Sequence, residues 1–74
     1  MTFDTSTYER SHGHTPRGRG GWMFQDADAF DADQRSNTYT WDTIHTFPGT
    51  YTEAKRAARA SGKFARSAYV VVMP

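Results

Sequence analysis

The sequence predicts an α+β fold in which one helix packs on one face of a small, antiparallel or mixed three-stranded sheet, in the order ββαβ. Three observations support this fold class. Residues 21–26 and 38–46 are rich in the aromatic and β-branched residues that strands prefer. Residues 51–60 are mostly strong helix formers, and residues 68–73 form a continuous apolar run typical of a buried strand. A chain of 74 residues is long enough for one domain, which we place at residues 21–74.

Residues 1–20 are expected to form a flexible basic arm that precedes this domain. The segment is polar, and Phe3 and Tyr8 are its only large anchors. Pro16 and the glycines around it disfavour a helix. We therefore expect the arm to be mobile where it leads into the first strand.

The segment before the second strand differs sharply from that strand in composition. Residues 26–37 contain four Asp residues and one large apolar residue, Phe30, so we expect an acidic loop there. In the strand at residues 38–46, Tyr39 and Trp41 are two positions apart and share one face. We therefore expect both aromatic rings to contribute to the core.

The helix has sequence signals at both ends. Thr50 followed by Glu53 is a capping box, in which each side chain binds a backbone N–H of the other residue. Gly62 supplies the left-handed conformation that ends many helices. Ala54 and Ala58 lie on one small-sided stripe, which allows the helix to approach the sheet closely.

A right-handed crossover would place the third strand parallel to the second, with the first strand between them. The apolar third strand needs cover on both faces, whereas one helix covers only one face. This mismatch predicts a homodimer or a stable complex with a partner. The residues expected in or beside the core are Trp22, Phe24, Tyr39, Trp41, Tyr51, Ala54, Ala58, Val70 and Val72.

Composition excludes several classes of protein. The chain has no Cys, which removes disulfides and thiolate zinc sites. Its net charge is +1, so it is not a bulk polycation, but acidic and basic residues are segregated along the chain. No apolar run is long enough to span a membrane and no signal-peptide core is present, so we expect a cytoplasmic protein.

The sequence offers weak candidates for a metal or catalytic site. His12 and His14 could share a metal ion, but His45 stands alone and no zinc spacing is completed. The Asp-rich segment resembles a calcium loop, but Phe30 occupies a ligand position and Asp31 occupies the position of the required Gly. No nucleophile elbow or phosphate-binding loop is present. We therefore expect no metal, no cofactor and no enzymatic activity.

Two basic segments are candidates for binding a partner or nucleic acid. Arg17 and Arg19 precede Trp22, an arrangement that suits contact with a polyanion or an acidic partner, although an ordinary polar tail explains it equally well. The helix adds a basic face, which alone would be typical of a solvated surface. The acidic loop is a second possible interaction site. The candidate residues are Arg17, Arg19, Trp22, Lys55, Arg56 and Arg59 for the basic site, and Asp26, Asp28, Asp31 and Asp33 for the acidic one.

Three sequence patterns resemble small phage- and plasmid-encoded accessory proteins. They are Pro-Arg-Gly-Arg-Gly-x-Trp-x-Phe at 16–24, Phe-Pro-Gly-Thr-Tyr-x-Glu-Ala-Lys-x-x-Ala at 47–58 and Val-Val-Met-Pro at 71–74, together about half of the chain. The resemblance implies an accessory protein that binds and modulates a host or defence protein, within a nucleic-acid-processing complex for instance. The alternative is a direct DNA- or RNA-binding protein that uses Arg17, Arg19 and the basic helix face. The net charge of +1 favours the protein partner, because dedicated nucleic-acid binders of this size are more basic.

Overall fold

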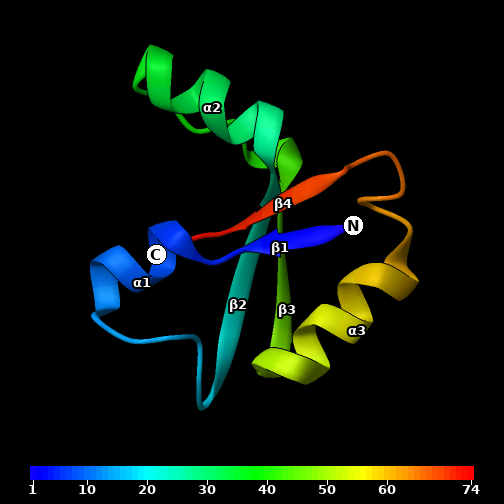
Figure 1. Cartoon of the computed structure of the whole chain (residues 1–74). Coiled ribbons are helices and arrows are strands. Elements are labelled where there is room, and N and C mark those ends of the chain that lie inside the picture. The colour runs from blue at the N-terminus through cyan, green and yellow to red at the C-terminus, as the bar shows by residue number, and fades with distance from the viewer.

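The computed structural model describes residues 1–74 and shows a four-stranded mixed sheet with three α-helices around it (Figure 1). The strands lie in the order β1-β4-β2-β3. The elements are β1 (Thr2–Asp4), α1 (Ser6–His12), β2 (Arg19–Asp26), α2 (Ala27–Ser36), a 3₁₀ turn (Trp41–Thr43), β3 (Ile44–Thr50), α3 (Tyr51–Ser61) and β4 (Tyr69–Val72). The α+β class is as predicted, but the three-stranded sheet with one helix is wrong.

The N-terminal segment that we expected to be a flexible arm contains two of the additional elements. Strand β1 pairs in parallel with β4, and Phe3 lies opposite Val70. Helix α1 then places Tyr8 in the core, where the residue is 8% exposed. Neither element shows the apolar periodicity of a strand or a helix, because each contributes only one apolar anchor. Their stability therefore depends on contacts with distant residues.

The arrangement of the three predicted strands is confirmed. Strand β2 lies between β3 and β4 and is antiparallel to both, so β3 and β4 run parallel to each other. The predicted bounds of the middle strand are wrong, because β3 begins at Ile44 rather than at residue 38. Residues 38–43 form an irregular segment and a 3₁₀ turn instead.

The expected acidic loop is a helix, α2. The Asp26 side chain accepts hydrogen bonds from the backbone N–H groups of Asp28 and Ala29, which satisfies the free donors at the helix start. The alanines between the aspartates favour helix. Asn37 adopts the left-handed conformation, with φ of 53°, and ends the helix.

The predicted helix is confirmed as α3, with the expected signals at both ends. Thr50 Oγ1 accepts a hydrogen bond from Glu53 N, and Glu53 Oε1 accepts one from Thr50 N. Gly62 has φ of 74° and follows the last turn. Gly49, in β3 directly before the N-cap Thr50, has φ of 110°, and a Cβ there would lie 2.7 Å from Glu53 Oε1. This position therefore requires glycine.

The core lies between one face of the sheet and α1, α3 and the loop that follows α3. Seven of the nine predicted core residues are buried or half-buried, but Tyr39 and Trp41 are exposed, so their placement in the core was wrong. The sequence-based prediction also missed several aromatic residues. The core cluster consists of Tyr8, Trp22, Phe24, Phe47, Ala54, Ala58, Phe64, Val70 and Val72, with Phe3 and Tyr51 packed against it.

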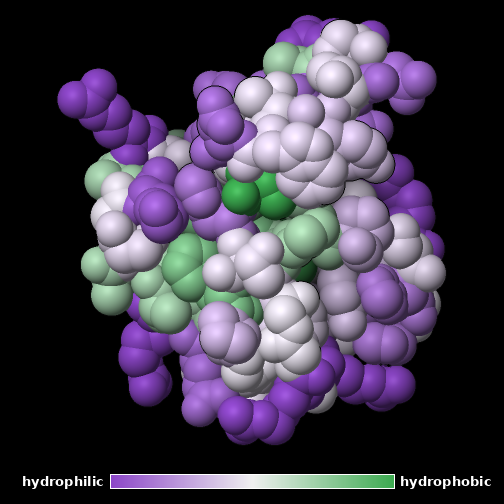
Figure 2. All heavy atoms as spheres, turned by 180° about the vertical axis from the view of Figure 1, so that it is seen from behind, coloured by the Kyte–Doolittle hydropathy of each residue, from purple (hydrophilic) through white to green (hydrophobic).

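The opposite face of the sheet is partly covered by α2. Val71 and Met73 are 4% and 8% exposed, and Gln25 on the same face is bonded to the α2 residue Asp33. Figure 2 views this side and shows its apolar residues gathered in the middle, within a polar surround. Both faces of β4 are therefore covered within one chain, which removes the mismatch that predicted a dimer.

None of the helices combines the length and apolar character that a membrane-spanning helix needs.

Candidate functional site

Three aromatic residues are largely exposed, and two of them, Tyr39 and Trp41, form a stacked pair. Tyr39 and Trp41 are 61% and 66% exposed, and their ring centroids lie 5.5 Å apart with the ring planes at 23°. A domain of this size has few large side chains with which to build a core. Two aromatic rings left in solvent are thus not explained by the fold. We refer to Tyr39 and Trp41 as the aromatic pair.

A buried polar network holds the backbone between the two rings. Asp33 is 5% exposed, and its carboxylate accepts hydrogen bonds from Thr40 Oγ1 at 2.6 Å and from Thr40 N at 2.7 Å. Gln25 Nε2 donates to Asp33 Oδ2 at 2.8 Å and to Thr43 Oγ1 at 2.9 Å, and Thr43 Oγ1 donates to Thr40 O. These contacts fix the segment that carries the aromatic pair.

Asp33 is held in its charged form by the same contacts. The hydroxyl and the backbone N–H of Thr40, followed by the amide of Gln25, lower the pKa of Asp33 below its ordinary value, and partial burial opposes them. The carboxylate therefore remains an acceptor throughout the neutral range. No buried side-chain polar atom in the molecule lacks a hydrogen-bond partner, so the network is complete.

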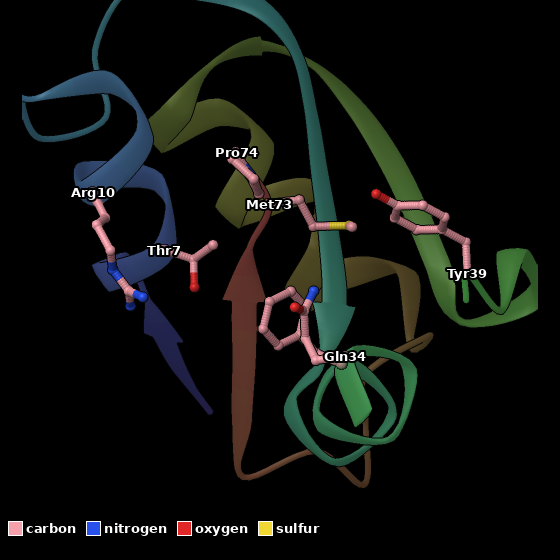
Figure 3. A pocket seen from close by; sticks show the side chains of 7 residues that line it. Thr7, Arg10, Gln34, Tyr39, Met73 and Pro74 are labelled. Carbon is pink, nitrogen blue, oxygen red and sulfur yellow. The ribbon is translucent and has the colours of Figure 1, made fainter. Parts of the chain in front are cut away.

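A hollow of about 390 Å³ adjoins Tyr39, the member of the aromatic pair that lines it. Figure 3 shows Tyr39 on one side of it, Thr7 and Arg10 on the other, and Gln34 at the α2 end, with Met73 pointing between them. Phe30 also lines the hollow. The surface thus offers apolar contact, neutral hydrogen-bonding groups and one guanidinium. Arg10 makes no ion pair within the chain, where the one ion pair joins Arg19 and Glu53.

The Asp cluster that sequence reasoning singled out is divided among different tasks. Asp26 caps α2, and Asp33 belongs to the network under the aromatic pair. Asp28 and Asp31 are exposed on α2. No three His, Cys, Asp or Glu side chains in the molecule are arranged to hold a metal ion. His12 stacks on Tyr8 with 4.0 Å between ring centroids, and His14 packs against the edge of the same ring.

Trp22, which we assigned both to the candidate basic site and to the core, lies in the core. Trp22 is 7% exposed, and its indole N–H donates to the Gly49 carbonyl at 2.9 Å. The ring packs against Tyr8 and Tyr51 in the core and presents no free face to a ligand. Trp22 is therefore a structural residue.

The two basic segments do come together. Arg19 Nη1 lies 3.3 Å from Glu53 Oε1, which joins the start of β2 to the first turn of α3. Arg19 and Arg56 both lower the pKa of Glu53, after the larger effect of the Thr50 backbone N–H, so both guanidinium groups lie near this carboxylate. Arg19 and Arg56 thus lie beside Glu53, and Lys55 and Arg59 lie on the same helix as Arg56. We refer to these four residues, together with Arg17 and Lys63, which flank them in sequence, as the basic surface.

Sequence reasoning missed the aromatic pair as a site because β propensity suggested a strand through residues 38–43. A signal was present. Thr38, Thr40 and Asp42 alternate with the two aromatic residues, and short polar side chains of this kind favour turns that bond to their own backbone. Thr43 makes such a contact, because its Oγ1 donates a hydrogen bond to the Thr40 carbonyl at 2.7 Å.

Comparison of this chain with protein-family models, with curated proteins and with solved structures finds nothing that matches it.

Proposed function

We propose that the chain is a non-enzymatic docking protein that binds another protein through the aromatic pair and the hollow beside it. One observation carries this proposal: Tyr39 and Trp41 are stacked and exposed although a complete buried network holds the segment between them. Tyr and Trp dominate the energetics of protein interfaces, since they bury a large area and lose little side-chain entropy. A rigid support reduces the cost of binding further.

The electrostatics of this end of the molecule favour a protein over a nucleic acid. Residues 26–42 carry five Asp residues and one Arg. A base stacked on Trp41 would bring its phosphates close to these carboxylates, which repel them. An uncharged or mixed protein segment meets no such penalty.

The hollow suggests what the partner segment offers. Phe30 and Met73 provide apolar contact for one side chain of the partner, while Thr7 and Gln34 can bond its backbone. The guanidinium of Arg10 can pair with a carboxylate of the partner. We therefore propose a partner segment that combines an apolar residue with an Asp or Glu.

The resemblance to phage and plasmid accessory proteins supports a host or defence protein as the source of that segment. The identification of the partner as a host or defence protein rests on the sequence, as does the absence of catalysis. Both are part of the proposal.

Selection from a peptide library tests the function directly. A random peptide library is panned against the wild-type chain, and the enriched peptides are measured against the Tyr39→Ala/Trp41→Ala variant. We expect enriched peptides that share an apolar residue next to an acidic one and bind the double variant at least tenfold more weakly, about 1.4 kcal/mol. Tyr69→Ala is the matched control, because Tyr69 is 59% exposed and does not line the hollow. No enrichment, or equal binding to the double variant, would overturn the proposal.

A further inference from the structure

We infer that the basic surface is a second, independent binding site, which takes the phosphate backbone of double-stranded nucleic acid. The residues concerned are distant in sequence, at residues 17–19 and 55–63, and the fold makes them one patch. The patch contains six cationic side chains, and Glu53 is the one carboxylate in these two segments and α3. The Glu9 carboxylate of α1 also lies nearby: burial raises the pKa of Tyr51, Arg59 lowers it and Glu9 raises it, so both charged groups lie close to that ring. Nothing in the aromatic pair or its network takes part.

The Arg19–Glu53 ion pair shows how the two segments meet. It links two largely exposed side chains, 71% and 53% accessible, so it contributes little to stability. The start of β2 is held beside α3 by the β2–β3 ladder, which pairs Arg19 with Thr50, the N-cap of α3. Arg17 is two residues away on the exposed loop before β2, and Arg56 is exposed on α3. Neither Arg17 nor Arg56 has an ion-pair partner within the chain.

Two further cations are positioned by aromatic rings. Lys55 Nζ lies 4.5 Å from the centre of the Tyr51 ring, and Arg59 Cζ lies 5.1 Å from the centre of the Phe3 ring. A ring face restrains the direction of a cation without occupying its N–H donors. Both side chains can therefore still bind phosphate oxygens. Lys55 and Arg59 are four residues apart, which separates them by roughly 6 Å along the helix axis. Two successive phosphates of one DNA strand advance by about 3.4 Å each along the duplex axis, roughly the same total distance.

The chemistry of the patch favours duplex backbone over single strands. Binding of unpaired bases relies on exposed aromatic faces. The basic surface has none, because Trp22 is buried and the half-buried Tyr51 ring lies under Lys55. The basic surface therefore consists of charged side chains and contains no group that recognises bases. Such a surface suits the dense charge of a duplex and is indifferent to its sequence.

The position of the patch keeps the acidic residues away from the bound polyanion. Figure 1 shows α2 at one end of the molecule, and α3 with the start of β2 toward the other. The four Asp residues at 26–33 therefore lie at the other end of the molecule from the basic surface, and the carboxylates beside that surface are Glu53 and Glu9. This separation explains how a chain with a net charge of +1 can present a strongly basic face.

Fluorescence anisotropy with a labelled 20-base-pair DNA duplex tests the inference. With about four phosphate contacts, we expect affinity to fall roughly 100-fold between 50 and 200 mM salt. The Arg17→Ala/Arg56→Ala variant should bind more weakly at 50 mM salt. The number of phosphate contacts derived from the salt dependence of its affinity should be smaller by about two. Arg35→Ala is the matched control, since it removes an exposed arginine from α2, and it should bind as the wild type does.

Three results would overturn the inference. They are the absence of duplex binding at 50 mM salt, an equal loss in the Arg35→Ala variant, and tighter binding of a single strand of the same length. Tighter binding of poly-glutamate than of unlabelled duplex at matched charge concentration would be a fourth, because it would assign the surface to an acidic protein instead. The Tyr39→Ala/Trp41→Ala variant should bind the duplex normally, so failure of this site is distinguishable from failure of the docking site.

Discussion

The Asp33 carboxylate accepts hydrogen bonds from both the hydroxyl and the backbone N–H of Thr40, and Thr40 is the residue that separates the two rings of the aromatic pair. One buried acidic side chain thus determines the path of the backbone at the most exposed apolar site of the molecule.

Asp33→Asn is expected to destabilise the fold and to loosen the aromatic pair. The amide keeps one acceptor oxygen, but its NH₂ group cannot accept from Thr40, and the stronger bonds to a charged acceptor are lost. We expect the melting temperature to fall by roughly 5–10 °C. Asp31→Asn on the exposed side of α2 is the control and should leave the melting temperature within about 2 °C of the wild type. Equal effects of the two variants would refute the role of the network.

Stability is expected to decrease in acid, with Asp33 as one cause. Hydrogen bonds from Thr40 lower the pKa of Asp33 in the folded state, so the unfolded chain binds a proton more readily. The stabilisation is complete above the unfolded value of about 3.9 and is lost as pH falls through the lower folded value. Asp4 and Glu53 also have lowered pKa values and act in the same direction. Urea midpoints at pH 7, 4 and 2.5 should fall less steeply for Asp33→Asn than for Asp31→Asn.

The two tryptophans should behave oppositely toward a quencher in water. Trp41 is 66% exposed, whereas Trp22 is 7% exposed and donates its indole N–H to Gly49. Trp41→Phe should leave a blue-shifted emission that acrylamide quenches poorly, and the unsubstituted chain should show an additional, easily quenched component. Strong quenching of the Trp41→Phe protein would mean that Trp22 is open to solvent, contrary to its place in the core.

Ala58→Leu is expected to overpack the contact between α3 and the sheet. Ala58 is completely buried, and its side chain lies in the core cluster. Extra methylene groups in a filled core cost about 1–3 kcal/mol. Ala57→Leu adds the same atoms to an exposed position of the same helix, and Leu is nearly as good a helix former as Ala. Chemical denaturation should therefore show a large loss of stability for Ala58→Leu and almost none for Ala57→Leu.

The parts of the fold that could be predicted are those with local signals. Helix α3 has a capping box, good helix formers and a terminal Gly62, all within one continuous segment. The apolar strand β4 was equally clear. Helix α2 had signals as well, because Asp26 precedes a series of alanines and Asn37 ends it. The interpretation as a loop gave too much weight to the aspartates and too little to the cap.

The rest depended on contacts between residues far apart in sequence. Tyr39 and Trp41 alternate as strand residues do, but Asp33 and Gln25 bind the polar residues beside them and draw the segment out of the sheet. No periodicity encodes that competition. Five of the residues of the basic surface were candidates on sequence grounds, and its binding role stays a prediction. The Arg19–Glu53 contact that joins its two segments is visible only in three dimensions.

The pairing of β1 with β4 has a consequence for the order of folding. Thr2 lies opposite Tyr69, so the ladder closes a loop of almost the whole chain. Closing so long a loop costs entropy that only a largely assembled sheet can offset. The hairpin of β2 and β3 joins segments much closer in sequence. Strand β1 is thus among the last to join the sheet, and Phe3 becomes buried only when β4 is in place beside it.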